Sequence, residues 1–213
     1  QMAYLSSALG ATSIRIPADC METGTTFLAA AQSRLHELHS SLTLSGFDQI
    51  IFEIGTFPVD GVMGNTVPYP DLEDEEYLSF LDEVEEMAKL LAKEYSEVTY
   101  WQIGNQLNND RFLHPIGWQE ENSPVSPFTM EEKTALAVDI MYRTMQGVRA
   151  AGSDATVIMP GIYGQDGLGS DTMVSFLDGI YTNIKSGKHG SDKVKDFFDA
   201  LAWHPSTDSE PDQ

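Results

Sequence analysis

The chain alternates short apolar segments of strand length with longer amphipathic segments of helix length, and this alternation limits the folds open to it. The strands are expected over Ala11 to Pro17, Gln49 to Phe57, Val98 to Gly104, Ala155 to Pro160 and Asp199 to Pro205. The helices are expected over Thr25 to Leu44, Asp74 to Tyr95, Thr129 to Ala151, Asp171 to Lys185 and Ser191 to Phe198. Strand followed by helix indicates a parallel α/β fold. Periodicity alone leaves a (β/α)₈ barrel and an open doubly wound sheet as alternatives.

Local signals mark the helix starts and the loops. Thr129 and Glu132 have the spacing of a capping box, which predicts the start of a helix. A loop rich in Pro and Gly is expected from Pro58 to Pro70. A glycine-rich loop is expected from Gly161 to Ser170, but it lacks the spacing and the lysine of a phosphate-binding loop. Nucleotide binding gains no support from it.

Composition excludes several functions. The formal charge of −21 opposes the phosphate backbone of nucleic acids, so a nucleic acid is not expected as a partner. No apolar run approaches the roughly 20 residues that span a bilayer, so no membrane partner is expected either. Cys20 is the single cysteine, and no His and Cys pair has ligand spacing. We therefore expect no intrachain disulfide, no metal and no cofactor.

Polar side chains gather where the predicted strands end. They are Arg15, Asn105, Gln106, Trp203 and His204. In a (β/α)₈ barrel the carboxyl ends of all strands open at one mouth, where the functional groups of such proteins lie. We therefore expect these residues, which are far apart in sequence, to share a single site.

The segment Val98 to Asn109, VTYWQIGNQLNN, resembles the fourth-strand motif of clan A glycoside hydrolases, which often reads W-x-I-G-N-E-x-N. Trp101, Gly104, Asn105 and Asn108 match it. Other segments follow in the expected order, with IRIP on a second strand and FFDALAWHP on a sixth. Similar elements occur in the β-xylosidase and α-iduronidase group, the heparanase-like group and the arabinofuranosidases, among which the sequence does not choose.

The resemblance implies a TIM barrel of which residues 1–213 hold only about strands 2 to 6. The segment Tyr4 to Gly10 reads as the helix before the second strand, so the first strand is expected to be absent. The seventh and eighth strands are also expected to lie outside this chain. The remaining barrel segments should then come from the same or an associated polypeptide, because an open barrel edge promotes aggregation.

The resemblance also implies roles for the clustered residues. Arg15 would support the nucleophile, Asn105 would bind the sugar 2-hydroxyl, and His204 with Trp203 would line the central subsite. Gln106 takes the position of the acid/base glutamate, and a carboxamide can neither protonate a leaving oxygen nor deprotonate water. The nucleophile of this clan follows the seventh strand, so no residue here receives that role.

The expected function is retaining hydrolysis of glycosidic bonds in polysaccharides or glycosides, impaired by Gln106. The alternative is an inactive carbohydrate-binding pseudoenzyme or an extracellular structural subunit on a glycosidase scaffold. Gln106 itself has two explanations that stay open: a deliberate change from Glu to trap a sugar, or a natural pseudoenzyme. The expected ligand is a carbohydrate and the expected location extracellular or secreted, with the cytoplasm left open.

Other residues have competing interpretations. Glu53 either points into the mouth or forms a buried ion pair with Arg15. Asp19, Cys20 and Glu22 follow the second strand and are within reach of a ligand, although acidic loops are common in so acidic a chain. Strand alternation predicts that Trp101 is core, pointing inward at a deeper layer of the barrel.

Overall fold

The centre of the fold is a parallel sheet of four strands in the order β1-β2-β6-β8. The structure, a computed structural model, describes residues 8, 10–17, 27–59, 62–119, 122–165 and 170–206. The strands are β1 (Ser13–Pro17), β2 (Gln49–Ile54), β6 (Tyr100–Ile103) and β8 (Thr156–Ile158). Each lies within a segment that the sequence predicts as a strand.

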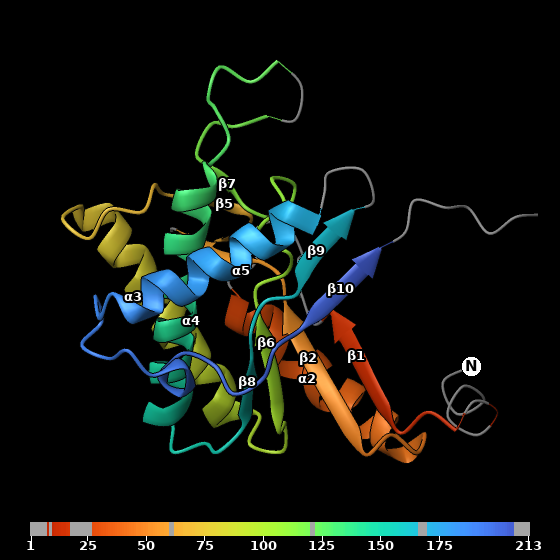
Figure 1. The fold of residues 1–213 in the computed structure, drawn as a ribbon. Coiled ribbons are helices and arrows are strands. Elements are labelled where there is room, and N and C mark those ends of the chain that lie inside the picture. The colour runs from red at the N-terminus through yellow and green to blue at the C-terminus, as the bar shows by residue number, and fades with distance from the viewer. Residues whose placement is uncertain are drawn as a thin grey trace, which may run out of the picture.

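A fifth strand position follows β8. The strand β9 (Ile162–Gln165) continues the path of β8, and β10 (Trp203–Ser206) pairs with β9 in parallel. An isolated bridge joins Ile158 to Ala200, which places the start of the β10 segment beside β8 (Figure 1). The strand positions therefore follow one another in chain order, whereas a doubly wound sheet reverses its order at a switch point. The fold is a (β/α)₈ barrel of which this chain holds about strands 2 to 6.

Helices connect the strands and cover one face of the sheet. They are α2 (Phe27–Leu44), α3 (Glu75–Glu94), α4 (Met130–Ala150) and α5 (Ser170–Lys185). Figure 1 shows α3, α4 and α5 gathered on one side of the strands. The side chain of Asp74 caps α3 by accepting from the Glu76 N–H at 2.8 Å. The predicted capping box of Thr129 and Glu132 is confirmed at the start of α4.

The two faces of the sheet differ sharply in burial. The face toward the helices is fully apolar and buried, with Phe52, Ile54, Trp101, Ile103 and Val157 in the core. On the opposite face, which lines the inside of the barrel, the row formed by Arg15, Ile51, Tyr100 and Thr156 stays partly or largely exposed. Two residues further along the strands, Glu53 and Gln102 on this same face are buried. The described chain thus leaves the inner face uncovered only toward the amino ends of the strands.

Trp101 corrects one prediction. It is buried, as expected, but its ring lies 6.0 Å from Phe52 and 6.4 Å from Tyr95, the C-cap residue of α3. It therefore packs between the sheet and the helices rather than inside the barrel. The inward residue of β6 is its neighbour Gln102, because successive side chains of a strand point to opposite faces.

A buried carboxylate ties the helices to the chain segment before β10. Asp139 on α4 accepts hydrogen bonds from Tyr77 of α3 at 2.6 Å and from His189 at 2.7 Å, and Lys188 Nζ lies 3.3 Å away. The ring of His189 stacks on Tyr142 at 4.4 Å. Burial, and then the charge of Asp139, raise the pKa of Tyr77 far above its usual value, so this phenol stays a donor.

Two predicted loops contain strands. The segment from Pro58 to Pro70 holds the end of β3 (Phe57–Val59), with β4 (Val62–Gly64) antiparallel to it, and also β5 (Thr66–Val67), which pairs with β7 (His114–Pro115). The predicted loop from Gly161 to Ser170 includes β9, and Ser170 begins α5. The partners of β5 and β9 are distant in sequence, so local turn residues gave no signal of those two pairings, whereas β3 and β4 pair locally.

The helix predicted over Ser191 to Phe198 is wrong. The structure has only a 3₁₀ turn, η1 (Val194–Asp196). The Ser191 hydroxyl donates to Asp196 and accepts from the Lys193 N–H, and such local bonds compete with a helix.

Some predictions fall outside the described residues. The acidic loop of Asp19, Cys20 and Glu22 is one of them. Of the helix predicted over Tyr4 to Gly10, only Ala8 and Gly10 are described. An irregular tail is predicted from Ser206 onward, but Ser206 is the last residue of β10. The residues after it are not among the described ones.

Candidate functional site

Arg15 is the centre of a polar network on the inner face of the barrel. Its Nη2 lies 2.8 Å from Glu53 Oε2 and donates to Asn105 Oδ1 at 3.3 Å, while Nε donates to Gln102 Oε1 at 2.9 Å. Glu53 and Gln102 are register partners on β2 and β6 and are almost fully buried. The ion-pair interpretation of Glu53 is therefore confirmed. The guanidinium compensates a carboxylate that burial would otherwise destabilise.

The backbone after β6 turns sharply to present Asn105 and Gln106. Gly104 has a φ of 95°, and Gln106 has a φ of 48°, in the left-handed region that L-residues rarely adopt. Gly104 N–H donates to the Ile54 carbonyl at 2.7 Å, which fixes the turn to β2. A strained non-glycine residue at the end of a barrel strand points to a functional position.

Gln106 and His204 meet across the mouth although they are 98 residues apart. Gln106 Nε2 lies 3.4 Å from His204 Nδ1, where the carboxamide N–H donates to an unprotonated ring nitrogen. The other ring nitrogen, Nε2, is buried without a hydrogen-bond partner in the part of the chain that the structure describes. The ring lies flat on Gly161, where a Cβ would come within 2.2 Å of it.

His204 carries a lowered pKa, first because it is partly buried and second because the positive charge of Arg15 is close. The imidazole is therefore neutral at pH 7. Below its ordinary value of 6.5, the unfolded chain takes up a proton that the folded chain resists, so this residue makes stability fall as the pH falls through that range.

Replacing the cation should raise the pKa of His204. In Arg15→Gln the charge is lost while burial remains, so the pKa should rise but stay below 6.5. The measurement is an NMR titration of the His204 ring. Arg149→Gln, which removes a guanidinium paired with Asp199 instead, is the control and should leave the titration unchanged. An unchanged His204 titration in Arg15→Gln would contradict the proximity of the two charges.

The structure brings the predicted site residues together. Arg15 contacts Asn105, the next residue is Gln106, and Gln106 contacts His204. Trp203 is not joined to them by any contact among the described residues. It is the register partner of the buried Ile162, whereas His204 is the partner of Tyr163, so the 45% exposed indole lies on the other face of β10 from His204.

Two residues of the site were not singled out from the sequence. Gln102 was read as part of an apolar strand, although a carboxamide within a buried strand is itself a signal, since a buried polar group needs a partner. Asn108 was noted only as a motif match. Both the nitrogen and the oxygen of its carboxamide bond to the backbone of Tyr163 on β9.

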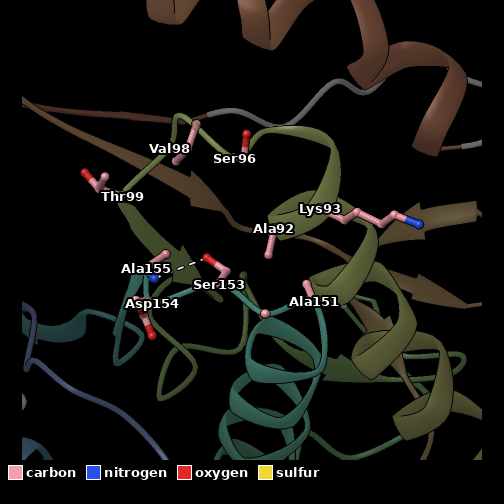
Figure 2. A pocket seen from close by; sticks show the side chains of 10 residues that line it. Ala92, Lys93, Ser96, Val98, Thr99, Ala151, Ser153, Asp154 and Ala155 are labelled. Atoms are coloured by element: carbon pink, nitrogen blue, oxygen red, sulfur yellow. Dashed lines mark hydrogen bonds between the residues drawn. The ribbon is translucent and has the colours of Figure 1, made fainter.

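A separate hollow lies at the opposite end of the strands. Its volume is about 360 Å³, and Lys93, Ser96, Ser153 and Asp154 are among its lining residues (Figure 2). Lys93 is in the last turn of α3 and Ser96 follows that helix, while Ser153 and Asp154 lie between α4 and β8. Because barrel chemistry lies at the carboxyl ends of strands, this hollow is not the candidate site.

The site offers mainly hydrogen-bonding groups, and the neutral imidazole of His204 can also exchange a proton. A guanidinium, two carboxamides and a neutral imidazole present donors and acceptors to the mouth. Within the described part of the chain, Glu53 is the carboxylate in contact with the network, and it is held in its ion pair. Among the described residues, no group of His, Cys, Asp and Glu side chains is arranged to hold a metal ion, and no helix is long and apolar enough to cross a membrane. Such a set suits a polyhydroxylated ligand.

The fold and site together define a partial (β/α)₈ barrel with a polar cluster at the carboxyl ends of its strands. In structure the chain is similar to a fungal β-1,4-galactanase, with a TM-score of 0.55 and 14% identity, over 95% of this chain and 54% of that chain. It is also similar to the AHE enzyme from Alicyclobacillus herbarius, with a TM-score of 0.48 and 12% identity, over 86% of this chain and 40% of that chain.

The likeness to the galactanase shows the fold alone. The chain spans about half the length of the galactanase chain that it matches. No protein-family model matches the sequence, and no curated protein matches it.

Proposed function

We propose that this chain is a glycoside hydrolase-like domain whose strand-end cluster binds carbohydrate, with hydrolysis impaired by Gln106. The observation that carries the proposal is the convergence of Arg15, Asn105, Gln106 and His204 on one mouth of a barrel. The fold shared with a β-1,4-galactanase supports it. So does the buried, unpartnered Nε2 of His204 among the described residues, because a buried donor is expected to have a partner such as a ligand hydroxyl.

The position of Gln106 fits that of an acid/base residue. It follows β6 directly, at the carboxyl end of a barrel strand, and its side chain reaches across to β10. Retaining hydrolysis needs a carboxyl group there, with a second carboxylate about 5–5.5 Å away as nucleophile. Arg15 would support that nucleophile, Asn105 would bind the sugar 2-hydroxyl, and His204 would line the subsite.

Further barrel strands are part of the proposal. Among the described strands, β1 pairs only with β2, and β10 pairs only with β9 and the bridge to β8. The inner face is also open at Ile51 and Tyr100. The first, seventh and eighth strands, from the same or an associated polypeptide, would cover this face and supply the nucleophile. We place the whole protein outside the cell, where polysaccharides occur.

The test restores the carboxyl group. The polypeptide that carries this sequence, expressed in full, is made as wild type, as Gln106→Glu and as Gln49→Glu. Gln49 is exposed at the opposite end of β2, so that variant adds the same charge away from the mouth. Turnover of a panel of aryl glycosides should rise by about 10²–10⁴-fold in Gln106→Glu and not in Gln49→Glu.

The same experiment separates the alternative. Gln106 itself favours a carbohydrate-binding pseudoenzyme, because its carboxamide cannot transfer a proton. Sugar binding without turnover in any variant would support that function. Absence of both binding and turnover would leave a structural assembly subunit and overturn the carbohydrate proposal.

A further inference from the structure

Asn108 links the loop after β6 to the strand β9 as a short piece of sheet would. Its Nδ2 donates to the Tyr163 carbonyl at 2.8 Å, and its Oδ1 accepts from the Tyr163 N–H at 2.9 Å. Both hydrogen bonds are reciprocal, so the side chain fixes the position and the direction of β9 at Tyr163. Substitution of one partner would leave two backbone groups of a partly buried strand without partners.

This link closes a circuit of contacts that runs through Tyr163, His204, Gln106 and Asn108. Tyr163 is the register partner of His204 across the β9–β10 pair. His204 contacts Gln106, and Gln106 lies two residues before Asn108 in the chain. The contact between Gln106 and His204 is long, at 3.4 Å, and a hydrogen bond of that length is too weak to align two strand ends by itself. The alignment of Gln106 with His204 therefore depends on the shorter hydrogen bonds of Asn108.

A second anchor holds Asn108 from the helix layer. Lys133, on the first turn of α4 and almost fully buried, donates to the Asn108 carbonyl at 3.3 Å. Its Nζ also lies 2.6 Å from Asp110 Oδ1. The backbone of the loop is thus tied to α4 while the side chain of Asn108 is tied to β9. Together they leave the loop little freedom between Gln106 and Asp110.

We propose that Asn108 is a positioning residue that sets Gln106 against His204 and so shapes the carbohydrate subsite between them. This inference rests on the proposed function for its ligand, but the positioning itself is a property of the fold. Asn108 does not touch the sugar, and it acts through Tyr163 and His204. The variant Asn108→Ala removes both hydrogen bonds, whereas Asn108→Asp keeps the acceptor for the Tyr163 N–H and loses the donor.

The first readout is the NMR signal of the His204 ring nitrogens in the full polypeptide. Asn108→Ala should shift these signals to those of a ring without its carboxamide partner, and Asn108→Asp should shift them less. Asn109→Ala is the matched control, because among the described residues the Asn109 side chain bonds only to the Arg111 N–H, and the substitution keeps the backbone. If Asn108→Ala does not fold, the His204 signals of Asn108→Asp alone test the inference. Unchanged His204 signals in a folded Asn108 variant, whatever its stability, would overturn the inference.

The second readout is binding of the oligosaccharide that the wild-type protein binds best in a panel of soluble glycans. Affinity should fall at least about tenfold in Asn108→Ala and stay within about twofold in Asn109→Ala. Equal affinities in both variants would contradict a subsite shaped by Asn108. If the wild type binds no glycan, the proposed function fails, and the His204 signals still decide the positioning separately.

Discussion

Replacing Asp139 by alanine should lower the free energy of unfolding by about 3–5 kcal/mol. The carboxylate is fully buried and bonds to Tyr77, His189 and Lys188, which come from α3 and from the segment between α5 and η1. Removing one partner of a buried charged group leaves the others without compensation. Urea denaturation of the variant and the wild type measures the loss.

Asp82→Ala is the matched control for Asp139→Ala. Asp82 also pairs with a cation, Arg143 on α4, but its side chain is 70% exposed. A solvent-exposed ion pair contributes at most about 1 kcal/mol, so this control should change stability little. A loss in Asp139→Ala as small as that in the control would show that the cluster does not hold α4 to the segment before β10.

Replacing Gly161 by alanine should displace His204 from the site. A Cβ at this position would lie 2.2 Å from the ring, well inside van der Waals contact, so the imidazole must move. Its contact with Gln106 would then be lost. We expect carbohydrate affinity to fall at least about tenfold, and turnover of the Gln106→Glu protein to fall about a hundredfold, as misplacement by 1 Å commonly costs.

The measurements for Gly161→Ala are calorimetric titration with the glycan and the NMR signals of the His204 ring. Gly64→Ala is the control, because the nearest heavy atom to its added Cβ is Thr66 N at 3.9 Å. That variant should bind as the wild type does. Unmoved His204 signals in Gly161→Ala would show that the ring does not rest on Gly161.

The sequence predicts the order of strands and helices well because each depends on local chemistry. The cap at Asp74 and the capping box at Thr129 are formed by residues within a single turn. The same holds for the polar residues after β6, which the strand period places at the mouth. The order in which the parallel strands pair depends on contacts between distant segments. The periodicity of the sequence therefore does not distinguish a barrel from an open sheet.

What the sequence does not predict is which partners the buried polar groups find. Gln102 and Asp139 each lie in an apolar stretch, and their partners are at least 49 residues away in the hydrogen bonds described above. The inward direction given to Trp101 failed for a related reason. Strand alternation states that neighbours point to opposite faces but not which face the helices cover.

The left-handed backbone at Gln106 has an energetic cost that depends on which residue stands there. Any residue with a Cβ costs about 1–2 kcal/mol in this conformation, and glycine would adopt it freely. Changing a glutamate to glutamine leaves that cost untouched. Gln106→Gly would therefore relieve the backbone at this position and at the same time remove the carboxamide that contacts His204.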